Sequence, residues 1–234
     1  MKKTSQAGLI LGMIILTGSS FAQSMDSVSV NGMRPARPKT YLDLVLNLVS
    51  TNINYGKANE SLADFKKTVL GGQLGASFQA GITSSFSLVS EFYFIMKGGQ
   101  LKANNPLTSA GSTLRFYTLE LPILARYHFG RYYVNAGPSI AYQVYGTKRT
   151  EDITTSLSFN DAVGGFRRLD VALQAGAGYR FHVKKRSLVL DVRYSYGLTN
   201  ISHSEEMYNR YLNVSLHVSN PWKSNPFGRN RKGK

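Results

Sequence analysis

The chain has 234 residues, a length that suits one barrel or one to two ordinary domains, and it contains no cysteine. The missing thiols exclude disulfides, thiol catalysis and thiolate metal sites. With 18% charged and 42% hydrophobic residues, the composition is typical neither of a helical membrane protein nor of a disordered chain. The formal net charge of +15 raises nucleic-acid binding as a question.

The N-terminus carries the features of a secretory signal. Two lysines come first, an apolar stretch follows, and the small residues Ser20 and Ala22 predict cleavage after Ala22. We therefore expect residues 1–22 to be a signal peptide that is removed, and residues 23–40 to form a flexible periplasmic lead-in. Export argues against nucleic acid as a partner and makes anionic lipid head groups the more natural counter-charge.

Residues 41–220 are the part of the chain that predicts a fold. No stretch in them approaches the roughly 20 apolar residues of a membrane-spanning helix, so an exported membrane protein of this sequence must be a closed β-barrel. Apolar and polar side chains alternate in eight stretches, as on the two faces of a strand. The predicted strands are 41–50, 69–82, 85–97, 115–129, 132–145, 168–182, 187–199 and 207–220.

The apolar side of these strands is expected to face lipid. In the stretch 115–129, Leu119, Leu121 and Ile123 share one face, and Glu120 lies on the other. Each stretch exceeds the five or six residues usual in soluble sheets, and its apolar face is rimmed with aromatics. The sequence therefore predicts an all-β, eight-stranded, antiparallel up-and-down transmembrane β-barrel. A soluble barrel is the alternative, but its apolar side chains would point into the interior and its polar side chains toward the solvent.

The predicted connections alternate in length. Short ones lie at 83–85, 130–131 and 183–186, and long ones at 51–68, 98–113, 146–167 and 200–206. Outer-membrane barrels have short periplasmic turns and longer external loops. We therefore expect extracellular long loops and periplasmic termini, including a basic tail at 221–234. The pair Gly130-Arg131 suits a type II′ hairpin turn.

Aromatic residues gather at both predicted rims, as expected where amphipathic rings meet two lipid interfaces. The periplasmic set is Phe86, Tyr127, Phe129, Tyr132, Tyr179, Phe181 and Trp222, and the outer set is Phe94, Tyr117, Tyr142, Tyr196 and Tyr208. Pro122 and Pro138 fall inside strands, where each removes a ladder hydrogen bond. We expect a local bulge where they meet across the hairpin. The alternative is a broken strand.

Several motifs resemble the PorT-like family of small outer-membrane β-barrels of Gram-negative bacteria. Leu119-Glu-Leu-Pro-Ile-Leu-Ala-Arg-Tyr127 is similar to a strand of that family, as is Val134-Asn-Ala-Gly-Pro138, and Gly176–Tyr179 and Leu190–Tyr194 add to the resemblance. The resemblance covers roughly residues 41–220 and implies an eight-stranded outer-membrane barrel. It implies no catalytic residues. Some members are linked to secretion of proteins across the outer membrane.

By alternation, the inward face holds five acids and five bases. The acids are Asp43, Glu91, Glu120, Asp170 and Asp191, and the bases are Lys97, Arg126, Arg168, Arg180 and Arg193. A barrel of eight strands is filled by its own side chains, and buried charges must be paired. We therefore expect an ion-pair network that plugs the lumen. A narrow gated polar path or a small-ligand site is the open alternative.

Three motifs raise chemical alternatives. His203-Ser204-Glu205-Glu206 has the residue types of a lipid-editing site, but adjacent residues of an extended segment point apart, so base and nucleophile would not meet. His128, His182 and His217 share inward parity near the short turns, but non-neighbouring strands argue against a shared metal. Gly71-Gly72 and Gly164-Gly165 lack the Lys-Ser/Thr of a phosphate loop. We expect no catalytic, cofactor-binding or metal site.

The sequence thus predicts a non-enzymatic outer-membrane barrel that acts as a structural or interaction protein, with an accessory role in protein secretion implied by the resemblance. Its expected partners are outer-membrane lipids and other cell-envelope or secretion proteins. A narrow channel or small-ligand transporter is the first alternative, and a lipid-modifying enzyme is the second. The sequence does not decide the specific partner, the oligomeric state or the role of the basic tail.

Overall fold

The computed structural model describes residues 40–183 and 186–219, without the side chains at 182–187 and 217–219. The predicted signal peptide 1–22, the lead-in up to residue 39 and the basic tail 221–234 lie outside the described residues. Among the residues that are described, no helix has the length and apolar character needed to cross a membrane.

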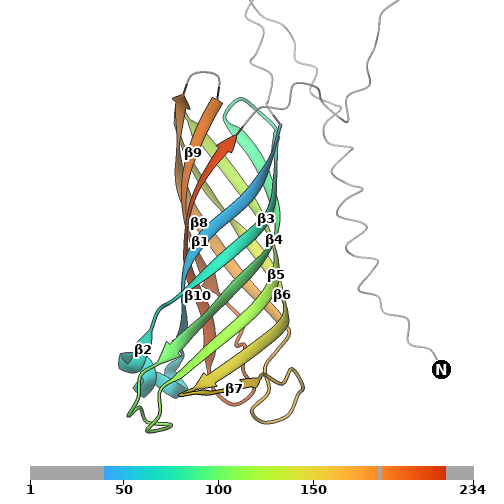
Figure 1. Ribbon diagram of the computed structural model, residues 1–234. Coiled ribbons are helices and arrows are strands. Elements are labelled where there is room, and N and C mark those ends of the chain that lie inside the picture. The colour runs from blue at the N-terminus through green and yellow to red at the C-terminus, as the bar shows by residue number, and fades with distance from the viewer. Residues whose placement is uncertain (1–39, 184–185, 220–234) are drawn as a thin grey trace, which may run out of the picture. The chain divides into compact units, whose positions relative to one another are not determined.

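Eight long strands pair in an antiparallel sheet that closes on itself (Figure 1). They are β1 (Tyr41–Tyr55), β3 (Val69–Gly81), β4 (Phe86–Leu101), β5 (Ser112–Phe129), β6 (Tyr132–Thr150), β8 (Leu169–Val183), β9 (Arg186–Gly197) and β10 (Met207–Ser219). Each pairs with the next in this order, and β10 pairs with β1 to close the ring. The predicted up-and-down barrel is therefore confirmed.

The long connections hold three short elements, namely the 3₁₀-helical segment η2 (Lys57–Phe65) and the strands β2 (Lys66–Lys67) and β7 (Ile153–Ser156). We call this end of the barrel the long-loop end and the other the short-turn end. Several strands run further into the long-loop end than predicted, with β1 ending at Tyr55 rather than 50 and β6 at Thr150 rather than 145. The prediction followed apolar alternation, whereas backbone pairing continues past it.

The direction of the alternation is also as predicted. In β1, Leu44 and Leu46 are 84% and 76% exposed, whereas Asn47 and Val49 are buried. The outer surface of the barrel is thus apolar and its interior polar. A soluble barrel would show the opposite arrangement, so that alternative is wrong.

Aromatic rings gather at both ends of this outer surface. At the short-turn end, contacts run along Phe129, Tyr132, Tyr179 and Phe181, with successive ring centroids 6.1, 4.7 and 4.5 Å apart. At the long-loop end, Tyr117 stacks on Phe94 and Tyr145 with centroids 6.1 and 5.8 Å apart. Trp222 of the predicted periplasmic rim lies outside the described residues.

The two prolines interrupt the ladder without a bulge. Pro122 pairs with Ser139, the next registered pair is Ala125 with Ala136, and the register is the same on both sides. The bulge expected here is therefore wrong: Pro122 and Pro138 each lack a backbone donor, which interrupts the pairing locally but inserts no extra residue. The register shift between β5 and β6 lies instead beside Tyr117 and Thr118. Both strands are continuous across the prolines, so the broken-strand alternative is wrong too.

Candidate functional site

Charged side chains fill the interior of the barrel and are almost completely buried. The set with at most 6% exposure is Glu91, Lys97, Glu120, Arg126, Asp170, Asp191 and Arg193. They lie on β4, β5, β8 and β9, where they alternate with outward apolar residues. Burial of charge is tolerable only when each charge is paired and hydrogen-bonded. These residues satisfy that condition in two groups.

The first group, which we call the Lys97 cluster, lies toward the long-loop end. The Lys97 Nζ atom is 3.2 Å from Glu120 Oε2 and 3.1 Å from Asp170 Oδ2. Asp170 also accepts hydrogen bonds from Thr199 and Asn209 at 2.8 and 2.7 Å. One ammonium group therefore serves two carboxylates, and neutral donors take up the remaining carboxylate lone pairs.

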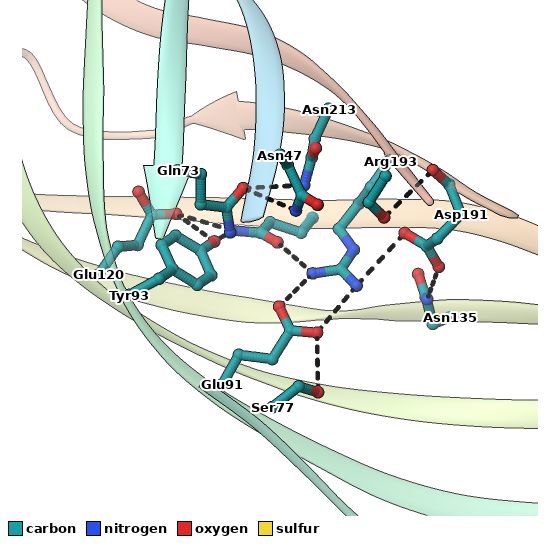
Figure 2. Close-up of polar contacts among 12 residues, drawn as sticks. Asn47, Gln73, Ser77, Glu91, Tyr93, Glu120, Asn135, Asp191, Arg193 and Asn213 are labelled. Atoms are coloured by element: carbon teal, nitrogen blue, oxygen red, sulfur yellow. Dashed lines mark hydrogen bonds and ion pairs between the residues drawn. The ribbon is translucent and has the colours of Figure 1, made fainter. Parts of the chain in front are cut away.

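Figure 2 shows the second group, the Arg193 cluster, whose Glu91 lies nearer the Phe86 end of β4, toward the short turns. Arg193 binds Glu91 through both terminal nitrogens, at 2.6 and 3.1 Å, and reaches Asp191 at 3.4 Å. Asp191 accepts the Tyr133 hydroxyl at 2.7 Å and lies 3.9 Å from Arg126. The planar guanidinium fork is suited to this two-point contact with a carboxylate.

Tyrosine and glutamine join the two clusters. Gln174 donates to Glu120 of the Lys97 cluster at 2.7 Å and accepts from Arg193 at 3.4 Å. The Tyr93 and Tyr211 hydroxyls lie 3.1 Å apart beside the same glutamine. The polar groups of the lumen thus form one continuous network from the long-loop half to the short-turn half.

Glycines make room for the large rings of this network. A Cβ atom on Gly75 would lie 2.4 Å from Cβ of Tyr93, and one on Gly178 would lie 2.1 Å from Cζ of Tyr133. The Tyr133 ring therefore occupies the space of an absent side chain, and the absence of a side chain at Gly75 allows the backbone and Cβ of Tyr93 to approach closely.

Arg168 is a correction to the predicted set of inward charges. It is exposed, its guanidinium stacks over Phe159 and Tyr142 at 4.8 and 5.7 Å, and its Nη1 donates to the backbone oxygen of Gln143 at 3.1 Å. Strand β8 begins at Leu169, so alternation does not fix the direction of the residue before it. Of the other predicted charges, Arg180 and Asp43 are partly buried rather than buried, and Arg180 lies over the Tyr41 ring.

A small cavity adjoins the Arg193 cluster. The volume that the centre of a water molecule can occupy in it is about 20 Å³. Asp43, Asn47 and Asn213 are among its lining residues. Buried atoms on its wall lack a hydrogen-bond partner among the described residues, including Nε of Arg193 and Oδ1 of Asn47 and of Asn213. A space of this size with such partners suits ordered water rather than an organic ligand.

An apolar cap closes the long-loop end, and sequence analysis missed it. The cap consists of Ile53, Tyr55, Leu62, Leu101, Leu114, Phe116, Phe166, Ile201 and Met207, with Phe65, Leu157 and Phe159 packed against it. Phe116 and Phe166 meet edge to face with centroids 5.3 Å apart. Several of these residues come from segments read as solvated loops. Isolated apolar residues such as Leu62 were the only available signal.

Hydrogen bonds of Glu206 connect the cap to the barrel. Its carboxylate accepts the Ala58 backbone N–H at 3.0 Å and the Tyr208 hydroxyl at 2.9 Å, and its own N–H donates to Asn59 at 2.7 Å. The two bonds to the carboxylate, the one from Ala58 first, hold the pKa of Glu206 below its ordinary value of 4.5. This residue links η2 to the start of β10.

The motif His203–Glu206, for which the sequence argued against a lipid-editing site, is not arranged as a nucleophile and base. His203 lies 3.6 Å from Asp161, whereas Ser204 Oγ accepts the Gly164 backbone N–H at 2.6 Å and Ser202 bonds Glu205. Each member therefore has a partner outside a Ser–His pair. His128 lies on the lumen side, 3.0 Å from Ser87 Oγ, while the side chains of His182 and His217 lie outside the described residues. Within the described part of the chain, no three potential metal ligands come together.

The family model for the outer membrane protein β-barrel domain matches residues 42–203, in agreement with this architecture. The chain is similar to Ail, the attachment invasion locus protein of Yersinia pestis, with 10% identity over 79% of this chain and 100% of that one and a TM-score of 0.43. It is also similar to OprG from Pseudomonas aeruginosa, with 11% identity over 84% of this chain and 100% of that one and a TM-score of 0.42. No curated protein matches the sequence.

Proposed function

Because this chain belongs to the family of outer membrane protein β-barrel domains, we propose that it is a non-enzymatic barrel that works through contacts with other components of the cell envelope. In this proposal the signal peptide is removed, both termini lie in the periplasm and the long-loop end faces outward. Transport and catalysis are not its main roles.

The observation that carries the proposal is the double closure of the lumen. The Lys97 and Arg193 clusters fill the interior with paired charges, and the apolar cap covers the long-loop end. An ion crossing the barrel would have to part both ion-pair groups and the packed rings above them. The geometry therefore supports a closed structural element rather than a steady conduit.

The long-loop end offers a surface for contacts with partners. Ile153 of β7 and Val163 of the following loop are 70% and 94% exposed, and Leu107 of another loop is 54% exposed. Exposed apolar side chains at loop tips are suited to protein contacts. These side chains lie outside the cap, so a partner can use them without opening the barrel.

Planar-bilayer recording tests the closed barrel. We expect no steady conductance from the purified protein, and none from Phe166→Ala, because the two ion-pair groups still fill the lumen when a ring of the cap is removed. A steady wild-type conductance that changes with Lys97→Met would contradict the proposal and favour the narrow-channel alternative. A mass change in lipid A that depends on His203 or Ser204 would instead favour the lipid-modifying enzyme.

We extend the proposal to an accessory role in protein secretion, on the resemblance of residues 119–127 and 134–138 to the PorT-like barrels. A photo-crosslinking residue at Val163, with one at the outward, lipid-facing Leu173 as control, tests this extension in living cells. The expected result is a crosslink to a secretion component at Val163 and none at Leu173. Normal secretion in a deletion strain would sink the extension and leave the barrel's closed architecture untouched.

A further inference from the structure

We propose that Arg115 and Arg168, which flank β6 at its long-loop end, form a binding site for the phosphate groups of outer-leaflet glycolipid. This inference concerns the lipid-facing wall and needs only the barrel and its orientation, not the interaction role proposed above. Arg168 was expected in the lumen, and Arg115 was given no role by the sequence.

The position of both arginines matches the level of lipid head groups. Arg115 has outward parity on β5, because Leu114 and Phe116 on either side of it are buried in the cap. It lies two residues closer to the loops than Tyr117, a member of the outer aromatic rim. Arg168 lies over Tyr142 of the same rim. Aromatic rims mark the lipid–water interface, so charges just beyond them meet the head groups.

Backbone carbonyls hold each guanidinium against the wall. Arg115 Nη1 donates to the Leu70 oxygen at 2.9 Å, and Arg168 Nη1 donates to the oxygens of Gln143 and Val144 at 3.1 and 3.4 Å. In the described part of the chain, Nε and Nη2 of both residues make no hydrogen bond. Two donors of each guanidinium thus stay available in a fixed orientation.

Neither guanidinium has a carboxylate partner within the described residues, in contrast to the buried arginines. Arg193 and Arg126 both lie within ion-pair distance of an acid, and the exposed Arg149 lies 3.7 Å from Asp152. A partly desolvated cation beside lipid is costly without an anion. The guanidinium of Arg115 lies toward β4 and β3, 3.6 Å from Met96 Sδ, and the stacked rings of Tyr117 and Tyr145 add a flat surface on the same outer face.

The chemistry of the free donors favours phosphate. A guanidinium presents paired N–H groups that match two oxygens of one phosphate, and arginine keeps its charge at every relevant pH. Because both side chains face the lipid, a phosphate carried by a membrane lipid can reach them, and lipid A supplies such groups in the outer leaflet. Arg210, another outward arginine at this level, is 9% exposed between Tyr196 and Tyr208, so we assign it a structural role.

Lipid binding by the full barrel in detergent tests the site. Native mass spectrometry would follow titration with bisphosphorylated lipid A, its dephosphorylated form, phosphatidylglycerol, or inorganic phosphate. We expect preferential binding of the phosphorylated lipid A, weakened about fivefold by Arg115→Gln or Arg168→Gln and about 25-fold by both. Arg131→Gln, the same charge change at the exposed turn of the opposite end, should leave binding unchanged, and Arg168→Lys should bind with intermediate affinity.

Heat-modifiable gel migration would first confirm that each variant is folded. Equal binding by the wild type and the double variant, or equal binding of the dephosphorylated lipid, would overturn the site. Equal binding of phosphatidylglycerol would overturn its assignment to the outer-leaflet glycolipid, and saturation by inorganic phosphate alone would overturn a lipid ligand. None of these results would bear on conductance or secretion.

Discussion

At the scale of single residues, one buried lysine in the lumen provides the positive charge that pairs with two buried carboxylates. Lys97 lies within 3.2 Å of Glu120 and 3.1 Å of Asp170, and none of the three side chains is more than 2% exposed. Lys97→Met would leave both carboxylates without a counter-charge in a buried site. We expect the free energy of unfolding to fall by about 3–5 kcal/mol, measured by urea unfolding in phospholipid vesicles.

Neutralising the partners provides the matched control for this prediction. A triple variant with Lys97→Met, Glu120→Gln and Asp170→Asn keeps hydrogen-bonding groups but removes the uncompensated charge, so it should regain most of the lost stability. Arg149→Ala breaks an exposed pair with Asp152 and should cost less than about 1 kcal/mol. A Lys97→Met barrel as stable as the wild type would show that the cluster is solvated rather than buried.

Individual side chains also show where alternation succeeds as a predictor. Glu91 and Lys97 lie well inside β4, where successive Cβ atoms must point to opposite faces, so their inward direction followed from the sequence. Arg168 lies one residue before β8, and its direction depends on carbonyls of β6 and on two rings. No local pattern contains that information, because these partners are distant in the chain.

At the scale of elements, the cap is a packed unit added to the end of the barrel. Phe166 is buried there against Phe116, although it lies in a connection between β7 and β8. Phe166→Ala should cost the cap about 3–5 kcal/mol through lost burial and a new cavity. The expected result is protease cleavage within residues 157–167 while the barrel keeps its heat-modifiable migration.

Val163→Ala is the control for this variant, because Val163 lies in the same loop and is 94% exposed. It should leave the cleavage rate unchanged. If Phe166→Ala instead lowered the unfolding midpoint of the barrel and left the loop resistant, cap and barrel would be a single cooperative unit.

The attachment of η2 to β10 should depend on pH through Glu206. Its pKa is held below 4.5 by bonds that exist only in the folded cap, so the stabilising effect is complete above that value and is lost as the pH falls through the lowered pKa. The protection factor of the Ala58 amide, which is its intrinsic exchange rate at each pH divided by the observed rate, should therefore fall on acidification. In Glu206→Gln this protection factor should be lower at neutral pH and lose its pH dependence. An unchanged protection factor at Ala58 from pH 7 to pH 3 would contradict the assignment.

The sequence predicted the eight strands but not the cap, because the two kinds of structure leave different signals in the chain. The eight strands repeat every two residues, so a local window contains their signal. The cap residues Leu62, Phe166 and Ile201 come from three separate connections and are brought together only by closure of the barrel. Likewise, whether Pro122 and Pro138 cause a bulge depends on the register between β5 and β6. The sequence of either strand alone does not specify that register.

At the scale of the whole molecule, an apolar wall that faces lipid predicts that the cost of adding a charge depends on the depth of the residue in the bilayer. Leu173 of β8 is 51% exposed and lies along the strand between Leu169, the register partner of Tyr142 in the outer rim, and Tyr179 of the short-turn rim, whereas the 70% exposed Leu70 of β3 lies near the long-loop end. An arginine in the hydrocarbon midplane is far from any head group, and one near the interface can reach water. We expect Leu173→Arg to lower the free energy of unfolding by about 2–4 kcal/mol and Leu70→Arg by no more than about 1 kcal/mol.

Folding into phospholipid vesicles followed by heat-modifiable gel migration measures this difference for the entire barrel. Val163→Arg, in a loop outside the lipid, should fold like the wild type and thereby excludes a general effect of added charge. If the barrel were surrounded by water, Leu173 and Leu70 would be equivalent exposed positions and both arginines would be tolerated. If the loss of folding free energy rises from Val163→Arg to Leu70→Arg to Leu173→Arg, the hydrocarbon of a bilayer surrounds the apolar wall. Only a bilayer makes the cost of an added charge depend on how deep the residue lies.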